Sequence, residues 1–336
     1  MYRKIMGFLE AWKENEHRKP LILQGARQVG KTYSILEFGR IHYENVAYFN
    51  FETNPKLNET FEEKISPDYL IPILSHIAGQ TIVKEKTLIV FDEVQLCERA
   101  LTSLKYFCED APDYHIIVAG SLLGVAVNRA KFSFPVGKVD MKTLYPMDME
   151  EFMIAVGEDE LVEQIKKCFE TNRPMPSALH DAAMQLYRQY LVVGGMPECV
   201  MQFVQTGDYI LIRHTQDTIL TSYLNDMSKY NNLNEIKKTR LAYDNITVQL
   251  SKKNTRFQYK LIKKGGRASE FENAIEWLCL SGIVSQVYRV EQIKKPLENY
   301  RDIDAFKIYV SDLGLLCAKK DLAANDILYM VEIGRA

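Results

Sequence analysis

The sequence predicts an α/β fold: a parallel sheet flanked by helices over residues 1–150, then a helical section over 151–230 and a mixed section over 231–320. In the first section, short apolar, β-prone runs alternate with helical stretches, as they do where crossover helices join parallel strands. After residue 150, apolar residues recur every three or four positions, which indicates helices. The mixed section adds two further β-prone runs and leaves 321–336 as a short tail.

The elements expected from this pattern follow in chain order. The strands of the first section are Leu21–Leu23, Val46–Phe51, Leu88–Phe91 and Ile116–Ala119, with helical spacing over Tyr33–Gly39 and Leu101–Cys108. The helical section contains helices over 158–170 and 177–193, and then Gly194-Gly195-Met196-Pro197. That turn between helices is expected to require positive φ. The mixed section runs as a helix over 236–250, a basic loop, a helix over 269–280 and β-prone runs over 283–290 and 306–310.

Composition excludes several classes of protein. The 42 basic and 44 acidic residues give a net charge of -2, so no global field draws the chain to nucleic acid or membrane. No apolar run approaches the roughly 20 residues that span a bilayer, and the N-terminus does not resemble a signal peptide. The six cysteines form no CxxC pair and the six histidines show no metal-site spacing. We therefore expect a cytoplasmic protein without a membrane partner.

A phosphate-binding loop is predicted directly after the first strand. The eight residues that fit G-x-x-x-x-G-K-[ST], the Walker A pattern, are Gly25, Ala26, Arg27, Gln28, Val29, Gly30, Lys31 and Thr32. Glycines let the loop curl so that several N–H groups and a helix N-terminus face one phosphate. Lys31 would reach the β- and γ-phosphates, and Thr32 would hold Mg²⁺ through its hydroxyl. The alternative is a chance glycine-rich turn.

Two carboxylates are expected at the end of the third strand, where α/β sheets bind ligands. Asp92 and Glu93 follow the apolar run Leu88–Phe91, about 60 residues after Lys31. In this Walker B arrangement Asp92 would support Mg²⁺, through Thr32 and water, and Glu93 would polarise the attacking water. The alternative is an ordinary strand end that leads into a polar loop.

Ser121 is the third candidate of the catalytic site. It follows the run Ile116–Ala119 and would lie on the strand next to the acidic one, where a small polar side chain can orient water against the γ-phosphate. The alternative is a strand-terminal turn. The sequence places no arginine finger, because the candidate arginines are scattered along the chain.

These motifs resemble the AAA-type (AAA+) ATP-binding proteins of bacteria and archaea. The residues that carry the resemblance are Gly25–Thr32, Phe91–Gln95, Ala119–Gly124, Phe134–Val139, Tyr190–Glu198 and Tyr309–Leu316. The resemblance runs from about residue 2 to about 320 and implies an AAA+ core over 1–150, a helical lid over 151–230 and a winged-helix-like section over 231–320. In most relatives a nuclease-like domain of unknown function would follow. Because the chain ends at Ala336, we expect that domain to be missing and 321–336 to be a truncated tail.

One stretch of the mixed section is strongly basic. Between residues 252 and 267 there are seven basic residues and no acidic one, namely Lys252, Lys253, Arg256, Lys260, Lys263, Lys264 and Arg267. Phe257 and Tyr259 are interleaved with them. In a winged helix this stretch would lead into the recognition helix, so contact with DNA phosphates is one interpretation. A solvated face, or a surface that docks protein, is the other.

Three functions are consistent with the sequence. The first is a Mg²⁺-dependent ATPase that switches or remodels a bound partner, DNA or protein, or a second copy of the chain. The second is a nucleotide-regulated DNA- or protein-binding module with negligible ATPase activity of its own. A remnant that only binds ATP is a third reading. The choice of ATP over GTP rests mainly on the resemblance.

Overall fold

The computed structural model describes residues 1–120, 134–229, 233–252 and 256–329. The chain divides into two compact units, one formed by Arg3–Tyr145 and the other by Met1–Tyr2 with the residues from Pro146 onward. No helix within the described ranges combines the length and the apolar character needed to cross a membrane.

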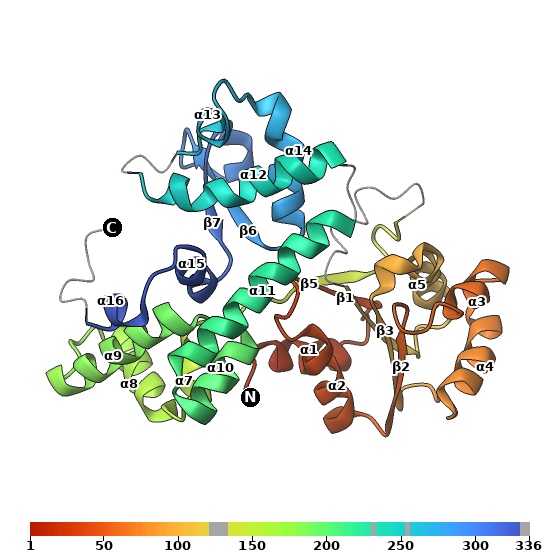
Figure 1. The fold of residues 1–336 in the computed structure, drawn as a ribbon. Helices are drawn as coiled ribbons and strands as arrows, with labels where there is room; N and C mark the ends of the chain where they lie inside the picture. Colours follow the sequence, from red (N-terminus) through yellow and green to blue (C-terminus); the bar gives the residue numbers. More distant parts are fainter. Residues whose placement is uncertain (121–133, 230–232, 253–255, 330–336) are drawn as a thin grey trace. The chain divides into compact units, whose positions relative to one another are not determined.

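The Arg3–Tyr145 unit contains a five-stranded parallel sheet (Figure 1). Its strands are β1 Leu21–Gln24, β2 Asn45–Asn50, β3 Thr87–Asp92, β4 His115–Gly120 and β5 Asp140–Thr143, in the spatial order β2-β3-β4-β1-β5. Every residue of β3 and β4 is buried, so these central strands read as continuous apolar runs in the sequence. The predicted α/β fold and its four strands are confirmed. The edge strand β5 is additional.

Helices cover both faces of this sheet. They are α1 Ile5–Glu14, α2 Lys31–His42, α3 Leu57–Glu63, α4 Pro67–Ala78 and α5 Glu98–Asp110, with a 3-10 turn, η1, at Val94–Leu96. On one face, Ile89 and Phe91 of β3 join a core with α3, α4 and α5, in which the Phe91 ring lies edge-on to Phe61. On the other face α2 packs so closely that a Cβ at Gly39 would press on Val46 of β2. This packing fixes the N-terminus of α2 at the carboxyl ends of the strands.

The second unit is mainly helical. Its elements are α7 Met149–Ala155, α8 Asp159–Thr171, α9 Ser177–Val193, α10 Pro197–Thr206, α11 Tyr209–Lys229, α12 Leu233–Leu250, α13 Tyr259–Ile262, α14 Ala268–Leu280, β6 Val284–Val290, η2 Leu297–Tyr300, β7 Arg301–Val310, α15 Leu313–Lys319 and α16 Ala324–Leu328. Of the predicted helices, 158–170 and 177–193 correspond to α8 and α9. Ile327 of α16 is buried with Val192 and Cys317, so residues at the start of the predicted tail contribute to a core.

The segment from α12 to β7 contains three helices, α12, α13 and α14, followed by the β6–β7 hairpin. β6 and β7 pair antiparallel, and α12 packs against α14. An aromatic cluster of Phe257, Tyr259 and Phe306 ties the segment before α13 to β7, with Phe257 stacked on Phe306 at 5.2 Å between ring centroids. This element order is the one that a winged helix would have, and the winged-helix identification stays a prediction.

The turn between α9 and α10 is held by a carboxylate from far along the chain. Gly194 has φ of 75°, as predicted, whereas Gly195 is required for space, because a Cβ there would overlap the carbonyl oxygen of Met147. Asp312 caps α15 by accepting the Leu315 N–H at 2.8 Å, and it also accepts the Gly195 N–H at 2.6 Å. Asp312 is only 4% exposed, so both hydrogen bonds are shielded from water.

Burial of Asp312 predicts a pH-dependent stability of this unit. Desolvation raises the pKa of Asp312 from 3.8 to about 6, although its backbone N–H partners oppose the shift. The folded state therefore holds this proton more tightly than the unfolded chain. We expect the contribution of Asp312 to the free energy of unfolding to fall by roughly 3 kcal/mol as pH rises from about 4 to about 6.

Urea unfolding at a series of pH values measures this dependence. Asp312→Asn removes the titrating group and is expected to flatten that part of the profile, whereas Asp326→Asn, at an exposed position in α16, is expected to leave it intact. An Asp312→Asn profile parallel to that of the wild type would contradict the assignment.

Candidate nucleotide site

The loop between β1 and α2 has the backbone that a phosphate site needs. Gly25 has φ of 148° and a Cβ there would overlap the carbonyl oxygen of Leu144, while Gly30 caps α2 with φ of 90°. Both positions therefore require glycine. Gln28, with φ of 66°, completes the curl. The N-terminus of α2 provides a favourable place for an anion, because the first N–H groups of a helix have no partner within the helix.

Arg3 supports this loop from behind. Its guanidinium donates to the carbonyl oxygens of Val29 and Tyr145, each at 2.8 Å. The side chain is 4% exposed, so these charge-assisted hydrogen bonds lie away from water. Arg3 therefore joins the phosphate loop to the segment that follows β5. The sequence alone gave no sign of this role, because the partners are 26 and 142 residues away.

Lys31 is the cation at the start of α2. Its ammonium donates to the carbonyl oxygens of Gly25 at 2.9 Å and Ala26 at 2.8 Å, and the residue is 7% exposed. The aliphatic stem is thus buried and the charge is held inside the curl of the loop. An anion at the N-terminus of α2 would therefore meet both a fixed positive charge and backbone donors.

Asp92 links the two sequence motifs. The Thr32 hydroxyl, on α2, and the Tyr48 hydroxyl, on β2, both donate to its Oδ2 at 2.8 Å. Its Oδ1 accepts the N–H of Glu93 at 3.0 Å. Asn50 in turn donates to the Tyr48 hydroxyl oxygen at 3.2 Å. Burial raises the pKa of Tyr48 to about 12, so the phenol remains a hydrogen-bond donor at neutral pH.

Glu93 lies next to Asp92 in an unusual backbone conformation. Its φ of 51° belongs to the left-handed region, which is costly for a side chain other than glycine and is typical of functional sites. The amide of Gln95 donates to its Oε2. Desolvation raises the pKa of Glu93 above 4.5, with the Gln95 hydrogen bond opposing the shift. A carboxylate with a raised pKa is the stronger base.

The structure brings together the predicted nucleotide-site residues that it describes. Residues 25–32, Asp92 and Glu93 converge at the carboxyl ends of β1 and β3, with β4 between these strands. Ser121 lies outside the described residues. Sequence reasoning missed Tyr48, Asn50 and Gln95. Alternation along β2 places Tyr48 and Asn50 on one face at the end of the strand, and this was the available signal.

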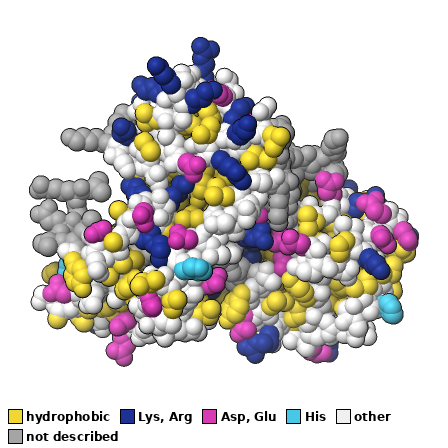
Figure 2. All heavy atoms as spheres, viewed as in Figure 1, with side chains coloured by type: hydrophobic (Ala, Val, Ile, Leu, Met, Phe, Trp, Pro, Cys, Tyr) yellow, Lys and Arg dark blue, Asp and Glu magenta, His cyan; other side chains and the backbone are white. Residues whose placement is uncertain are grey.

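The described cations of the basic stretch are exposed, but the stretch is not entirely the loop that was predicted, because part of it is helical. Lys252, Arg256, Lys260, Lys263, Lys264 and Arg267 are exposed, and Lys253 lies outside the described residues. Part of the stretch forms the short helix α13, and Phe257 is 5% exposed and belongs to the core rather than to a binding surface. Lys263 pairs with Glu270 at 3.0 Å. Figure 2 shows Lys and Arg gathered over the surface of α12, α13, α14 and the hairpin.

Two family models match parts of the chain. Residues 17–153 match the model of the AAA domain, and residues 184–326 match a domain of unknown function, DUF8612. The AAA match contains the phosphate loop, Asp92 and Glu93. No curated protein matches the chain significantly.

Solved structures show where the fold recurs. The Walker-type ATPase PABY2304 of Pyrococcus abyssi is 14% identical, with a TM-score of 0.56, and the match covers 95% of each chain. The ORC2 protein of Aeropyrum pernix is 11% identical over 97% of this chain and 94% of its own, with a TM-score of 0.44. The first similarity establishes that the chain has the fold of a Walker-type ATPase, and at this identity it establishes only the fold.

Proposed function

We propose that the chain is a Mg²⁺-dependent ATPase that uses hydrolysis to switch or remodel a bound partner. One observation supports this most directly: the ammonium, the hydroxyl and the two carboxylates of the motifs lie at one edge of the sheet, joined by the hydrogen bond between Thr32 and Asp92. The AAA match over residues 17–153 favours ATP as the nucleotide.

The loop would bind the phosphates of ATP. The N–H groups at the start of α2 face the position of a phosphate, and Lys31 adds a full positive charge there. Arg3 keeps the loop in this shape by holding Val29 and Tyr145. Because the loop is already curled, binding costs little reorganisation of the backbone.

The donor set at Asp92 fits Mg²⁺. A hydroxyl and a carboxylate are oxygen ligands of the kind that Mg²⁺ prefers, with substrate phosphates and waters filling the other positions. The described residues contain no group of three or more His, Cys, Asp or Glu that would form a cage made of protein alone. Thr32 would bind the ion directly and Asp92 would hold it through water. Bound there, Mg²⁺ would neutralise charge that develops on the phosphates.

Glu93 would act as the general base. It would accept a proton from water as the water oxygen attacks the γ-phosphorus, and the bond from that phosphorus to the bridging oxygen would break to give ADP and phosphate. Gln95 holds one carboxylate oxygen of Glu93 and so restricts the orientation of the base. Its raised pKa favours proton transfer.

Phosphate release tests the proposal directly. The purified chain is expected to hydrolyse ATP with Mg²⁺ and to stop when the ion is chelated. Turnover should be measured alone and with single-stranded or duplex DNA, since a partner can be required for activity. Absence of hydrolysis under all these conditions would overturn the ATPase assignment.

Tyr48→Phe is expected to raise about tenfold the Mg²⁺ concentration that is needed to support ATP binding. The reason is that partners that orient a metal-supporting carboxylate contribute strongly to metal affinity. The measurement is the affinity for a fluorescent ATP analogue, titrated with Mg²⁺ and repeated in chelator. Affinity in chelator should stay near the wild-type value.

Tyr43→Phe is the matched control for this change. The Tyr43 hydroxyl lies 2.7 Å from Nδ1 of His115, at the amino ends of the strands. The variant loses a comparable hydrogen bond away from the site. An equal shift in both variants would point to a general loss of stability and would contradict the positioning role of Tyr48.

A second candidate function is a nucleotide-regulated module that binds nucleic acid and hydrolyses ATP negligibly. The exposed basic surface around α13 favours it. Residues 252–310 contain twelve basic and seven acidic residues in a chain of net charge -2. Negligible turnover without a partner, together with tight binding of nucleotide, would favour this candidate.

A further inference from the structure

One face of the β6–β7 hairpin carries exposed apolar and basic side chains. Val287 and Lys307 are directly opposite each other across the two strands, and Tyr309 follows Lys307 by two residues on the same face of β7. Val287 is 50% exposed and Tyr309 is 41% exposed. The opposite face is the one that carries Phe306 and Ile308 into the core. Within the part of the chain that the structure describes, the hairpin is therefore packed on one side.

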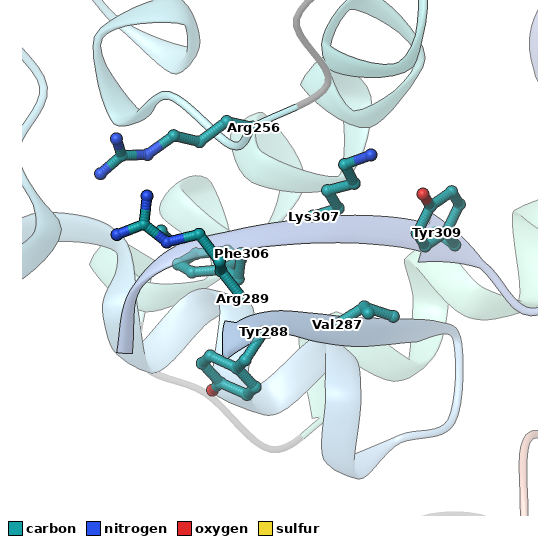
Figure 3. A pocket seen from close by; sticks show the side chains of 8 residues that line it. Arg256, Val287, Tyr288, Arg289, Phe306, Lys307 and Tyr309 are labelled. Carbon is teal, nitrogen blue, oxygen red and sulfur yellow. The ribbon is translucent and has the colours of Figure 1, made fainter. Parts of the chain in front are cut away.

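An open pocket of about 340 Å³ lies on this face. Its lining consists of Arg256, Val287, Tyr288, Arg289, Ala305, Phe306, Lys307 and Tyr309, with three cations and no carboxylate among them. Figure 3 shows Lys307 and Tyr309 beside each other on β7, and the guanidinium groups of Arg256 and Arg289 extending to the same side. On the exposed face of the hairpin, the pocket thus joins the cation of Lys307 to the side chain of Val287 and the ring of Tyr309.

As far as the structure describes the chain, two of the three cations of the pocket are held by hydrogen bonds or ion pairs, and the third is not. Arg256 donates to the carbonyl oxygen of Asp304 at 3.1 Å, and Arg289 pairs with Asp302. Lys307 has no hydrogen-bond or ion-pair partner among the described residues. The ring of Tyr288 is already covered by Arg301, at 4.2 Å from its centroid, whereas the Tyr309 ring makes no ring contact within the described chain. Lys307 and Tyr309 are therefore the groups available to a ligand.

We propose that this face of the hairpin binds single-stranded nucleic acid, with a phosphate on Lys307 and an unpaired base on Tyr309. The inference rests on the second candidate function, since it names the surface and the strandedness of the ligand. Charge complementarity favours a polyanion. The exposed Tyr309 ring favours a strand whose base faces are open, because the bases of a duplex are stacked on one another and an acidic peptide has no comparable π-face.

Fluorescence anisotropy of the full chain with a labelled oligothymidylate of about 20 nucleotides tests the proposal. Lys307→Glu and Tyr309→Leu are each expected to weaken binding about tenfold, and Lys307→Glu should also reduce the salt dependence of the affinity. Thermal unfolding of each variant shows whether the hairpin still folds. A further variant, Lys307→Gln, removes the charge without reversing it and should give a smaller loss.

Lys260→Glu with Lys264→Glu tests the other basic surface, because both lysines are exposed near α13 and neither lines the pocket. Loss of binding in this pair, with wild-type binding in Lys307→Glu and Tyr309→Leu, would overturn the hairpin proposal and leave the second candidate function standing. No binding of single strand or duplex by the wild type would overturn both. Tighter binding of duplex, or equal competition by polyglutamate, would also overturn the proposal.

Discussion

Affinity for ATP is expected to fall about a hundredfold or more when Lys31 is replaced by alanine. The ammonium is the full positive charge that the loop offers at the start of α2, and charge-assisted hydrogen bonds to phosphate are among the strongest polar contacts. The substitution also removes the hydrogen bonds to Gly25 and Ala26. Equilibrium binding of a fluorescent ATP analogue provides the measurement.

Two further variants separate loss of charge from loss of folding. Lys31→Met keeps most of the aliphatic stem and should lose affinity to a similar degree. Lys86→Ala removes an exposed lysine that pairs with Glu44, just before the amino end of β3, and should bind ATP as the wild type does. Wild-type affinity in Lys31→Met would refute the phosphate-binding role of this loop.

Turnover is expected to fall by about two to four orders of magnitude in Glu93→Gln, while affinity for ATP stays close to that of the wild type. The amide matches the carboxylate in size but cannot accept the proton from water. It can still accept the hydrogen bond from Gln95 through its carbonyl oxygen. Phosphate release and equilibrium binding, measured on the same preparation, give the two quantities.

Glu52→Gln is the control for this change. Glu52 is an exposed carboxylate that raises the pKa of Glu93 through its charge, so the change alters the local field without removing the base. It should retain most of the turnover. If Glu93→Gln hydrolyses ATP as fast as the wild type, the base is another residue.

The parts of the fold that follow from local pattern were predictable. β3 and β4 are buried throughout, so their sequences are continuous apolar runs. β5 was missed because Asp140–Thr143 is a polar strand at the edge of the sheet, with Met141 48% exposed. A short edge strand has one neighbour and no apolar signature. Its existence depends on β1 being beside it.

The motif residues of the site were predictable and their supporting residues were not. A glycine pattern and an acidic strand end are local features, so residues 25–32, Asp92 and Glu93 could be named in advance. Tyr48 reaches Asp92 only because β2 lies beside β3, and Arg3 reaches Val29 only in the folded unit. Pairings of this kind depend on long-range topology, and no local sequence window contains them.

In the basic stretch, the exposure of the charged residues was predictable from the sequence, but the burial of an aromatic residue was not. Its charges predicted an exposed surface, and its six described cations are exposed. The alternation with aromatic residues suggested a binding surface, yet Phe257 stacks on Phe306, which is 49 residues further along the chain. Whether an aromatic residue packs inward depends on that distant partner, so charge was the more reliable guide at this position.

The contact between Asp312 and Gly195 has a consequence for synthesis of the chain. These residues are separated by 117 positions, so the turn between α9 and α10 cannot acquire its final hydrogen bond until Asp312 has left the ribosome. The Arg3–Tyr145 unit has no such dependence and can fold first. During translation, α9 to α11 would therefore keep part of their apolar surface exposed until α15 has been synthesised. Aggregation is most favoured during this interval.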